Sequence, residues 1–211
     1  MTDRSIPTVN KIGRWIVADL PLATHGQRIG LLGGSFNPAH DGHLHISNLA
    51  RARLGLDAVW WLVSPQNPLK GDQAAPLAKR LADARRLAHG GFIKVTGFEQ
   101  VIGASFTIET VRYLVRRLPT SRFVWIMGAD NLEILHQWKA WLRIAATIPL
   151  AVIDRPGSGL SAAASPAARR LERFRLEESD ALHLVSSPPP AWVLLHGPLS
   201  PLSSTTIRAG L

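Results

Sequence analysis

Two histidines close to a pair of glycines are the residues of this sequence best suited to chemistry. The stretch Gly33-Gly34-Ser35-Phe36-Asn37-Pro38-Ala39-His40-Asp41-Gly42-His43 follows an apolar run. Paired glycines permit a tight turn and a close approach of backbone to a ligand, and we expect Gly42 and His43 to open a helix. A helix N-terminus attracts phosphate, and two histidines three positions apart can point at the same anion. The stretch therefore predicts a phosphate site.

Two other interpretations apply to the same histidines. They could be surface residues beside a flexible loop, or ligands of a metal ion together with His45, as in a metal hydrolase. The only nearby carboxylate is that of Asp41, and no cysteine is present, so the metal site lacks an obvious ligand set. His45 is two positions past His43 and points elsewhere on a helix, so we expect it to be structural or exposed.

A second polar cluster lies near the end of the chain, in Leu202-Ser203-Ser204-Thr205-Thr206-Ile207-Arg208. Serine and threonine are natural N-caps, and hydroxyls, helical N–H groups and a guanidinium together can bind an anion. Taken by itself, the cluster equally describes an ordinary helix cap with a surface arginine.

The surrounding pattern consists of apolar strands that alternate with helical periods. We expect strands at 28–32, 58–63, 92–96, 122–127, 150–153 and 192–195, and helices at 44–54, 77–88 and 108–118. Strands that are apolar throughout and separated by helices indicate a mostly parallel sheet covered on both faces, a doubly wound α/β fold. Its ligands bind at the carboxyl ends of the strands, where Gly33 to His43 begins. The stretch from 156 to 168 is interpreted as a loop that leads into a helix.

Composition restricts the remaining possibilities. The 211 residues suit one domain, which we place at 28–211, with 1–27 as an N-terminal extension. The absence of cysteine, of a signal peptide and of an apolar run of membrane-spanning length favours a cytoplasmic protein without a membrane partner. The net charge of +9 favours anionic partners; a nucleic-acid-binding module is one alternative, although the basic residues are scattered.

The first stretch resembles the Gly-x-Phe-x-x-x-His-x-Gly-His signature of the nucleotidyltransferase superfamily, and the second resembles its Ser-Ser-Thr-x-Ile-Arg signature. The resemblance implies a Rossmann-like nucleotidyltransferase fold. It also implies catalytic roles for His40, His43 and Arg208. The ATP-binding residues that it implies are Gly33, Gly34, Ser35, Phe36, His40, His43, Ser203, Ser204, Thr205 and Arg208.

Segments between the two signatures resemble the nicotinate-mononucleotide adenylyltransferases. They comprise 61–70, 105–110, Gly128-Ala129-Asp130, Trp138-Lys139 and Arg155-Pro156-Gly157. A tryptophan face can stack on a pyridine ring, a helix start can hold a carboxylate, and an aspartate at a strand end can bind ribose hydroxyls. The resemblance therefore places Asn37, Lys70, Thr107, Asp130 and Trp138 at the mononucleotide. Core packing for Trp138 and ordinary caps for Thr107 and Asp130 are the alternatives.

The resemblance predicts transfer of AMP from ATP to nicotinate mononucleotide, with release of pyrophosphate. Mg²⁺ is expected to arrive with ATP, without a dedicated protein site for the metal. Neither nucleic acid nor membrane is an expected partner. The nearest alternative is another adenylyl- or cytidylyltransferase, such as phosphopantetheine adenylyltransferase. The sequence does not decide whether the preferred acceptor is nicotinate or nicotinamide mononucleotide.

Overall fold

The computed structural model describes residues 19–65, 75–154 and 159–197. Their central element is a six-stranded sheet in the order β3-β2-β1-β4-β5-β6, in which every pair of neighbours is parallel. This strand order is that of the doubly wound dinucleotide-binding fold. The strands are β1 (Arg28–Gly34), β2 (Ala58–Val63), β3 (Ile93–Thr96), β4 (Arg122–Gly128), β5 (Leu150–Ile153) and β6 (Trp192–Leu195).

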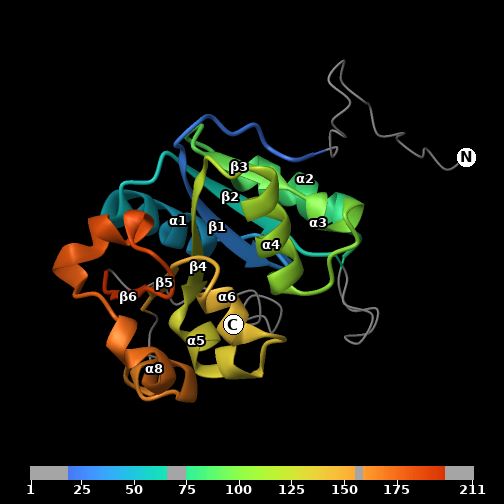
Figure 1. Ribbon diagram of the computed structural model, residues 1–211. Helices are drawn as coiled ribbons and strands as arrows, with labels where there is room; N and C mark the ends of the chain where they lie inside the picture. The colour runs from blue at the N-terminus through green and yellow to red at the C-terminus, as the bar shows by residue number, and fades with distance from the viewer. Residues whose placement is uncertain (1–18, 66–74, 155–158, 198–211) are drawn as a thin grey trace, which may run out of the picture.

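Helices cover both faces of the sheet (Figure 1). The helical segments are α1 (Asp41–Leu54), α2 (Leu77–Leu87), α3 (Phe98–Val101), α4 (Thr107–Arg117), α5 (Ala129–Ile134), η2 (Leu135–Gln137), α6 (Trp141–Ala145), α7 (Gly159–Ala163), α8 (Pro166–Leu171), η3 (Glu172–Phe174) and η4 (Glu178–Ser186). The expected doubly wound α/β class is confirmed.

Successive side chains along the strands point to opposite faces of the sheet and pack into two separate hydrophobic cores. Trp60 and Trp125 belong to the core beneath α4, α5, α6 and α8, whereas Trp61 and Ile126 belong to the core beneath α1, α2 and η4. Because both faces are buried, the central strands are apolar throughout, which explains why their positions could be predicted from sequence.

The expected elements differ from the observed ones mainly at their ends. β1 continues to Gly34 and α1 already begins at Asp41, two and three residues beyond the expected limits. α7 occupies part of the expected loop at 156–168, and α8 is the helix into which that loop was expected to lead; no range was predicted for the other short helices. A segment of five or six residues is too short to show a helical period.

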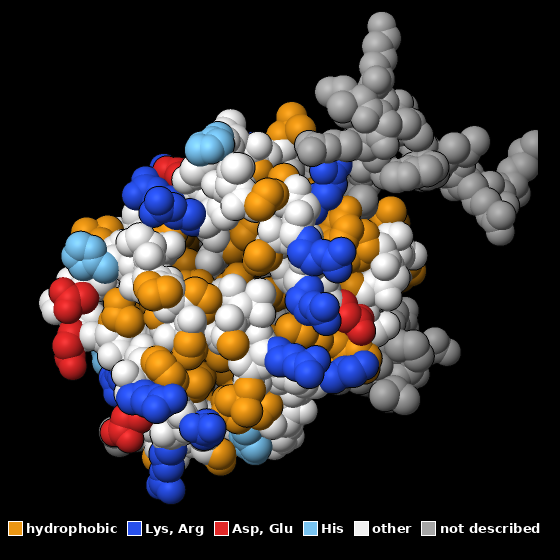
Figure 2. Space-filling view, in the orientation of Figure 1, with side chains coloured by type: hydrophobic (Ala, Val, Ile, Leu, Met, Phe, Trp, Pro, Cys, Tyr) orange, Lys and Arg blue, Asp and Glu red, His pale blue; other side chains and the backbone are white. Residues whose placement is uncertain are grey.

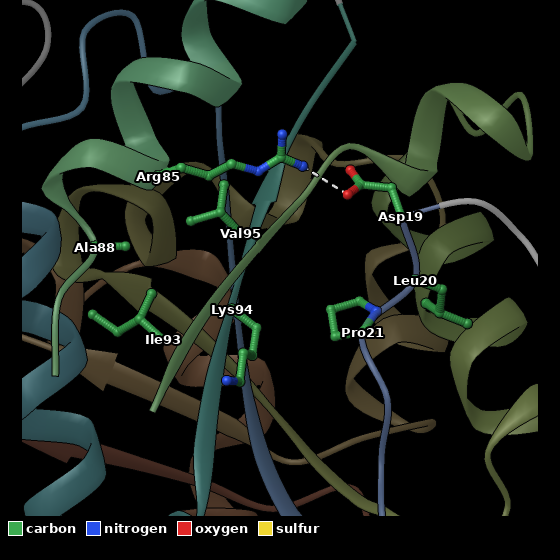
Figure 3. Close-up of a pocket in the computed structure, with 8 residues that line it drawn as sticks. All are labelled: Asp19, Leu20, Pro21, Arg85, Ala88, Ile93, Lys94 and Val95. Carbon is green, nitrogen blue, oxygen red and sulfur yellow. Dashed lines mark hydrogen bonds and ion pairs between the residues drawn. The ribbon is translucent and has the colours of Figure 1, made fainter. Parts of the chain in front are cut away.

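Residues 19–27 begin beside β3, and their Leu20 and Ala23 pack against the core that contains Trp60. The Asp19 carboxylate accepts hydrogen bonds from the Gly97 N–H at 2.6 Å and from Arg85 at 2.7 Å. Together with β3 and α2 they enclose a hollow of about 340 Å³, across which Arg85 and Asp19 point toward each other (Figure 3). None of the expected site residues lines this hollow. The division of the chain at residue 28 stays a prediction.

Candidate active site

The strand order switches between β1 and β4, and a doubly wound fold is expected to have its ligand crevice at the carboxyl ends of these two strands. The chain leaves β1 toward α1 on one face and leaves β4 toward α5 on the other. Gly33 to His43 therefore borders the crevice from the β1 side, and Asp130, in the first turn of α5, borders it from the β4 side. This is the position at which doubly wound sheets bind their ligands.

The two histidines form the start of α1. His40 is its N-cap, and its Nδ1 accepts a hydrogen bond from the Gly42 N–H at 3.1 Å. The Nδ1 of His43 accepts one from the His40 N–H at 3.2 Å. A backbone N–H can only donate, so each Nδ1 carries a lone pair and each neutral ring holds its proton on Nε2. Both rings thus keep an Nε2–H donor, with ring centroids 4.0 Å apart.

A stack of aromatic rings holds His43 in place. Phe36 is buried and lies against His43 at 4.4 Å between ring centroids and against Trp61 at 5.2 Å. The Trp61 indole N–H donates to Ser47, whose hydroxyl donates to the His43 carbonyl oxygen at 2.7 Å. Since the ring of Phe36 is buried against His43, it fixes the position of the imidazole, and the role of Phe36 at ATP stays a prediction.

The glycines serve close packing rather than a left-handed turn. Both Gly33 and Gly34 lie within β1, and the left-handed residue of the loop is Phe36, at φ 48°. A Cβ added to Gly33 would lie 2.8 Å from the ring of Trp125, a contact that no side chain can make without displacing the indole. The expectation of a tight turn at the glycines is therefore wrong, and burial between two rings is what compensates the unusual backbone of Phe36.

Trp138 packs against Trp125, a residue of β4. The two indoles meet edge to face with centroids 6.4 Å apart, and the Trp125 ring also underlies Gly33. Trp138 is partly buried, whereas Trp60, Trp61, Trp125 and Trp192 are fully enclosed. Unlike these four, Trp138 combines a fixed position with an accessible part of its surface, as a stacking platform requires.

Thr107 is the first residue of α4, and Phe106 is its N-cap. The Glu109 carboxylate accepts from the N–H groups of Ser105 and Phe106 at 2.9 and 3.2 Å. The N–H groups of Thr107 and Ile108 follow at the positions where a helix offers donors without intrahelical acceptors. These two N–H groups lie beside the Glu109 carboxylate in the first turn of α4, and the binding of an anion at Thr107 stays a prediction.

Lys139 adds positive charge beside this turn. Its ammonium group lies 3.9 Å above the Phe106 ring and 4.0 Å from the Glu109 carboxylate. Basic side chains gather over α4 and α6 (Figure 2), where a groove of about 690 Å³ is lined by Arg112, Arg116, Arg117, Lys139 and Arg143. Their combined potential favours a negatively charged ligand near α4.

Ser35 and Asn37 complete the loop after β1. Ser35 is exposed, and the Asn37 side-chain oxygen accepts from the Ala75 N–H at 3.2 Å. Arg80 donates to the Ser35 carbonyl oxygen. The sequence assigned no role at the site to Arg80, Trp61 or Lys139, because only the fold brings Arg80 and Trp61 to this loop and Lys139 to the first turn of α4.

Several expected site residues lie outside the described part of the chain: Lys70, Ser203, Ser204, Thr205 and Arg208. Within residues 19–65, 75–154 and 159–197, no group of three or more His, Asp or Glu side chains is placed to hold a metal ion. His45, which we expected to be structural or exposed, is partly buried on α1. No helix in the described ranges is long and apolar enough to cross a membrane.

Comparison with known proteins shows the family to which the chain belongs. The sequence model of the cytidylyltransferase-like family matches residues 31–210. A protein of Cereibacter sphaeroides named "Probable nicotinate-nucleotide adenylyltransferase" is 54% identical over 181 residues, covering 86% of this chain and 96% of its own. A protein of the same name from Methylorubrum extorquens is 55% identical over 182 residues, covering 86% and 98%.

A solved structure shares the fold. The nicotinic acid mononucleotide adenylyltransferase of Plasmodium falciparum, complexed with NaAD, aligns with a TM-score of 0.59 at 16% identity, covering 87% of this chain and 83% of the other. The match to the family model and the identity to the named relatives show that the chain is a nucleotidyltransferase, with its histidine-capped helix at the switch point of the sheet. The chain belongs to the cytidylyltransferase-like family and, within it, to the nicotinate-nucleotide adenylyltransferases.

Proposed function

We propose that this enzyme transfers AMP from ATP to the 5′-phosphate of nicotinate mononucleotide, forming nicotinate adenine dinucleotide and pyrophosphate. The observation that carries the proposal is identity of 54–55% to relatives of that name, over nearly their whole length. The same identity favours this reaction over the phosphopantetheine enzyme, the nucleic-acid-binding module and the metal hydrolase.

The reaction is a direct displacement at the α-phosphorus. A bond forms between an oxygen of the mononucleotide phosphate and the α-phosphorus, the bond from that phosphorus to the bridging oxygen breaks, and pyrophosphate leaves with the electron pair. The attacking phosphate is already a nucleophile, so the site has to supply orientation and charge stabilisation. The Nε2–H groups of His40 and His43 and the N-terminus of α1 supply donors for the phosphate oxygens.

The mononucleotide is proposed to lie across the β4 side of the crevice. Trp138 stacks on the pyridine ring, and the first turn of α4 at Thr107 receives the nicotinate carboxylate. Asp130 accepts hydrogen bonds from ribose hydroxyls, and Asn37 and Lys70 contact the mononucleotide. The edge-to-face contact of Trp138 with Trp125 and the charge of Lys139 beside α4 support this placement.

The ATP side is proposed to comprise the loop from Gly33 to Phe36, the two histidines, and Ser203, Ser204, Thr205 and Arg208. The groups that we assign to phosphate at the start of α1 are N–H donors, whereas Mg²⁺ prefers oxygen ligands. The ion therefore fits as a companion of ATP, held by phosphate oxygens and water, where it would neutralise charge on the leaving pyrophosphate. A cytoplasmic location is part of the same proposal.

The proposal is tested by measuring pyrophosphate release from ATP with nicotinate mononucleotide, nicotinamide mononucleotide or phosphopantetheine as acceptor. Release is expected with the two pyridine mononucleotides, faster with the nicotinate form because the α4 turn and Lys139 favour an anion. Release with phosphopantetheine alone would contradict the assignment.

A further inference from the structure

Arg80 is a buried cation behind the loop that follows β1. It lies on α2 and is 2% exposed, whereas Lys79, Arg85 and Arg86 on the same helix have half or more of their side chains in solvent. Arginine is rarely enclosed to this extent unless its hydrogen bonds hold neighbouring groups in place.

One guanidinium group joins three separate segments of the chain. Its Nη1 donates to the carbonyl oxygens of Ser35 at 2.7 Å and Ser64 at 2.8 Å, and its Nε donates to that of Ala75 at 2.8 Å. Ser35 directly follows β1, and Ser64 directly follows β2. Arg80 therefore ties the carboxyl ends of two neighbouring strands to the segment that precedes α2.

The bond to Ser35 orients the next peptide group. A trans peptide is planar, so its N–H points opposite to its C=O. With the Ser35 carbonyl oxygen directed at Arg80, the N–H of Phe36 is directed away from α2. The same peptide begins the left-handed turn of Phe36 that carries its ring onto His43.

The charge of Arg80 is not balanced by a carboxylate of the described residues. Its three bonds go to neutral carbonyl oxygens, and its Nη2 is buried without a hydrogen-bond partner among those residues. Burial lowers the pKa of the guanidinium, but arginine stays protonated in proteins. An isolated buried charge is costly, and an anion bound nearby offsets that cost.

We propose that Arg80 is a positioning residue for the triphosphate: it fixes the Ser35–Phe36 peptide that faces the phosphates and supplies a buried positive charge behind it. The proposal rests on the proposed function only in taking ATP as the phosphate-bearing substrate. Arg80 acts through the loop and does not touch the reacting atoms.

The test is calorimetric titration with ATP–Mg²⁺ and with pyrophosphate–Mg²⁺ of the wild type, Arg80→Met and Arg80→Lys. Arg86→Met is the matched control, because Arg86 is exposed on the same helix and pairs with Asp83 at the surface. The dissociation constant is independent of the fraction of folded protein, which the fitted number of sites reports separately. A purely structural role would lower the number of sites or the melting temperature and leave the dissociation constants unchanged.

Arg80→Met is expected to raise both dissociation constants about 10- to 100-fold, the loss typical of one charge-assisted hydrogen bond. Arg80→Lys keeps the charge but loses the planar fork, so its increase is expected to be smaller, and Arg86→Met should match the wild type. If Arg80→Met does not fold, the dissociation constants of Arg80→Lys alone test the proposal. Unchanged dissociation constants in the folded Arg80 variants overturn the proposal. The titrations contain no mononucleotide. The measured dissociation constants would therefore stand even if nicotinate mononucleotide failed as the acceptor in the proposed reaction.

Discussion

Replacing His43 by alanine and by asparagine separates the roles of its two ring nitrogens. The Nδ1 accepts from the His40 N–H at 3.2 Å and so completes the cap of α1, while Nε2 carries the proton offered to phosphate. An asparagine oxygen can take the place of Nδ1 at this third helical position. Its side chain is too short to present a donor where Nε2–H lies. Alanine replaces neither nitrogen.

The two variants should therefore differ in stability but not in turnover. A cap bond of this length contributes about 0.5 to 1 kcal/mol, and the stack on Phe36, lost in both variants, contributes about 0.5 to 1.5 kcal/mol. For a chain of this size each kcal/mol moves the melting temperature by about 2 to 4 °C. His43→Asn should thus melt a few degrees above His43→Ala. Both should lose about 100- to 1000-fold in kcat, as expected on removal of one preorganised donor to the transition state.

The assay is pyrophosphate release at saturating substrates, alongside thermal unfolding of each variant. His45→Ala is the control, since His45 lies on the same helix two positions beyond His43 and outside the proposed site. Near-wild-type turnover in His43→Asn would refute the role of the Nε2–H donor. Equal melting temperatures of the two His43 variants would refute the role of Nδ1 as a cap.

Three further outcomes follow from the structure. Stacking does not distinguish acid from amide, so Trp138→Ala should weaken nicotinate and nicotinamide mononucleotides alike by about tenfold, whereas Thr107→Val should narrow the nicotinate preference. The nicotinate preference is measured as the ratio of kcat/KM for nicotinate mononucleotide to that for nicotinamide mononucleotide. A ratio that falls to one in Trp138→Ala but not in Thr107→Val would reverse the roles assigned to these two residues. Burial raises the pKa of the Glu99 carboxyl above its ordinary value. Between these two pKa values the carboxyl is protonated in the native state and ionised in the unfolded state. The free energy of unfolding of the wild type therefore falls as pH rises above the ordinary glutamate pKa. Glu99→Gln should lack this fall, and urea unfolding curves that depend on pH identically in both proteins would contradict it. Gly33→Ala would bring a Cβ within 2.8 Å of the Trp125 ring, so we expect a loss of about 1 to 3 kcal/mol in unfolding free energy; an unchanged denaturation midpoint would show that the indole yields freely.

The sheet could be predicted from sequence because its strands other than the edge strand β3 are buried on both faces. Their apolar runs stand out, and β2, β5 and β6 agree with the expected ranges to the residue. The histidines beside a strand end also indicated that a helix begins near Gly42, one residue after the observed start of α1 at Asp41. These are local signals, in which the residues themselves carry the period or the cap.

The packing behind the site could not be predicted in the same way. Arg80 lies 45 positions from Ser35, the residue whose carbonyl oxygen it binds, and its helix shows three other basic residues that are solvated. Trp125 beneath Gly33 depends on the register between β1 and β4. The left-handed conformation of Phe36 depends on two rings that enclose it. Each of these features arises from contacts between distant segments, which no period along the chain reveals.

The most direct measurement of the central claim follows the α-phosphate of ATP. Enzyme, nicotinate mononucleotide and ATP labelled at the α-phosphorus should yield labelled nicotinate adenine dinucleotide in equal amount to pyrophosphate. In the absence of a mononucleotide, labelled pyrophosphate should not exchange into ATP, because transfer is direct. Label that remains in AMP or stays on the protein, or exchange without an acceptor, would contradict the account.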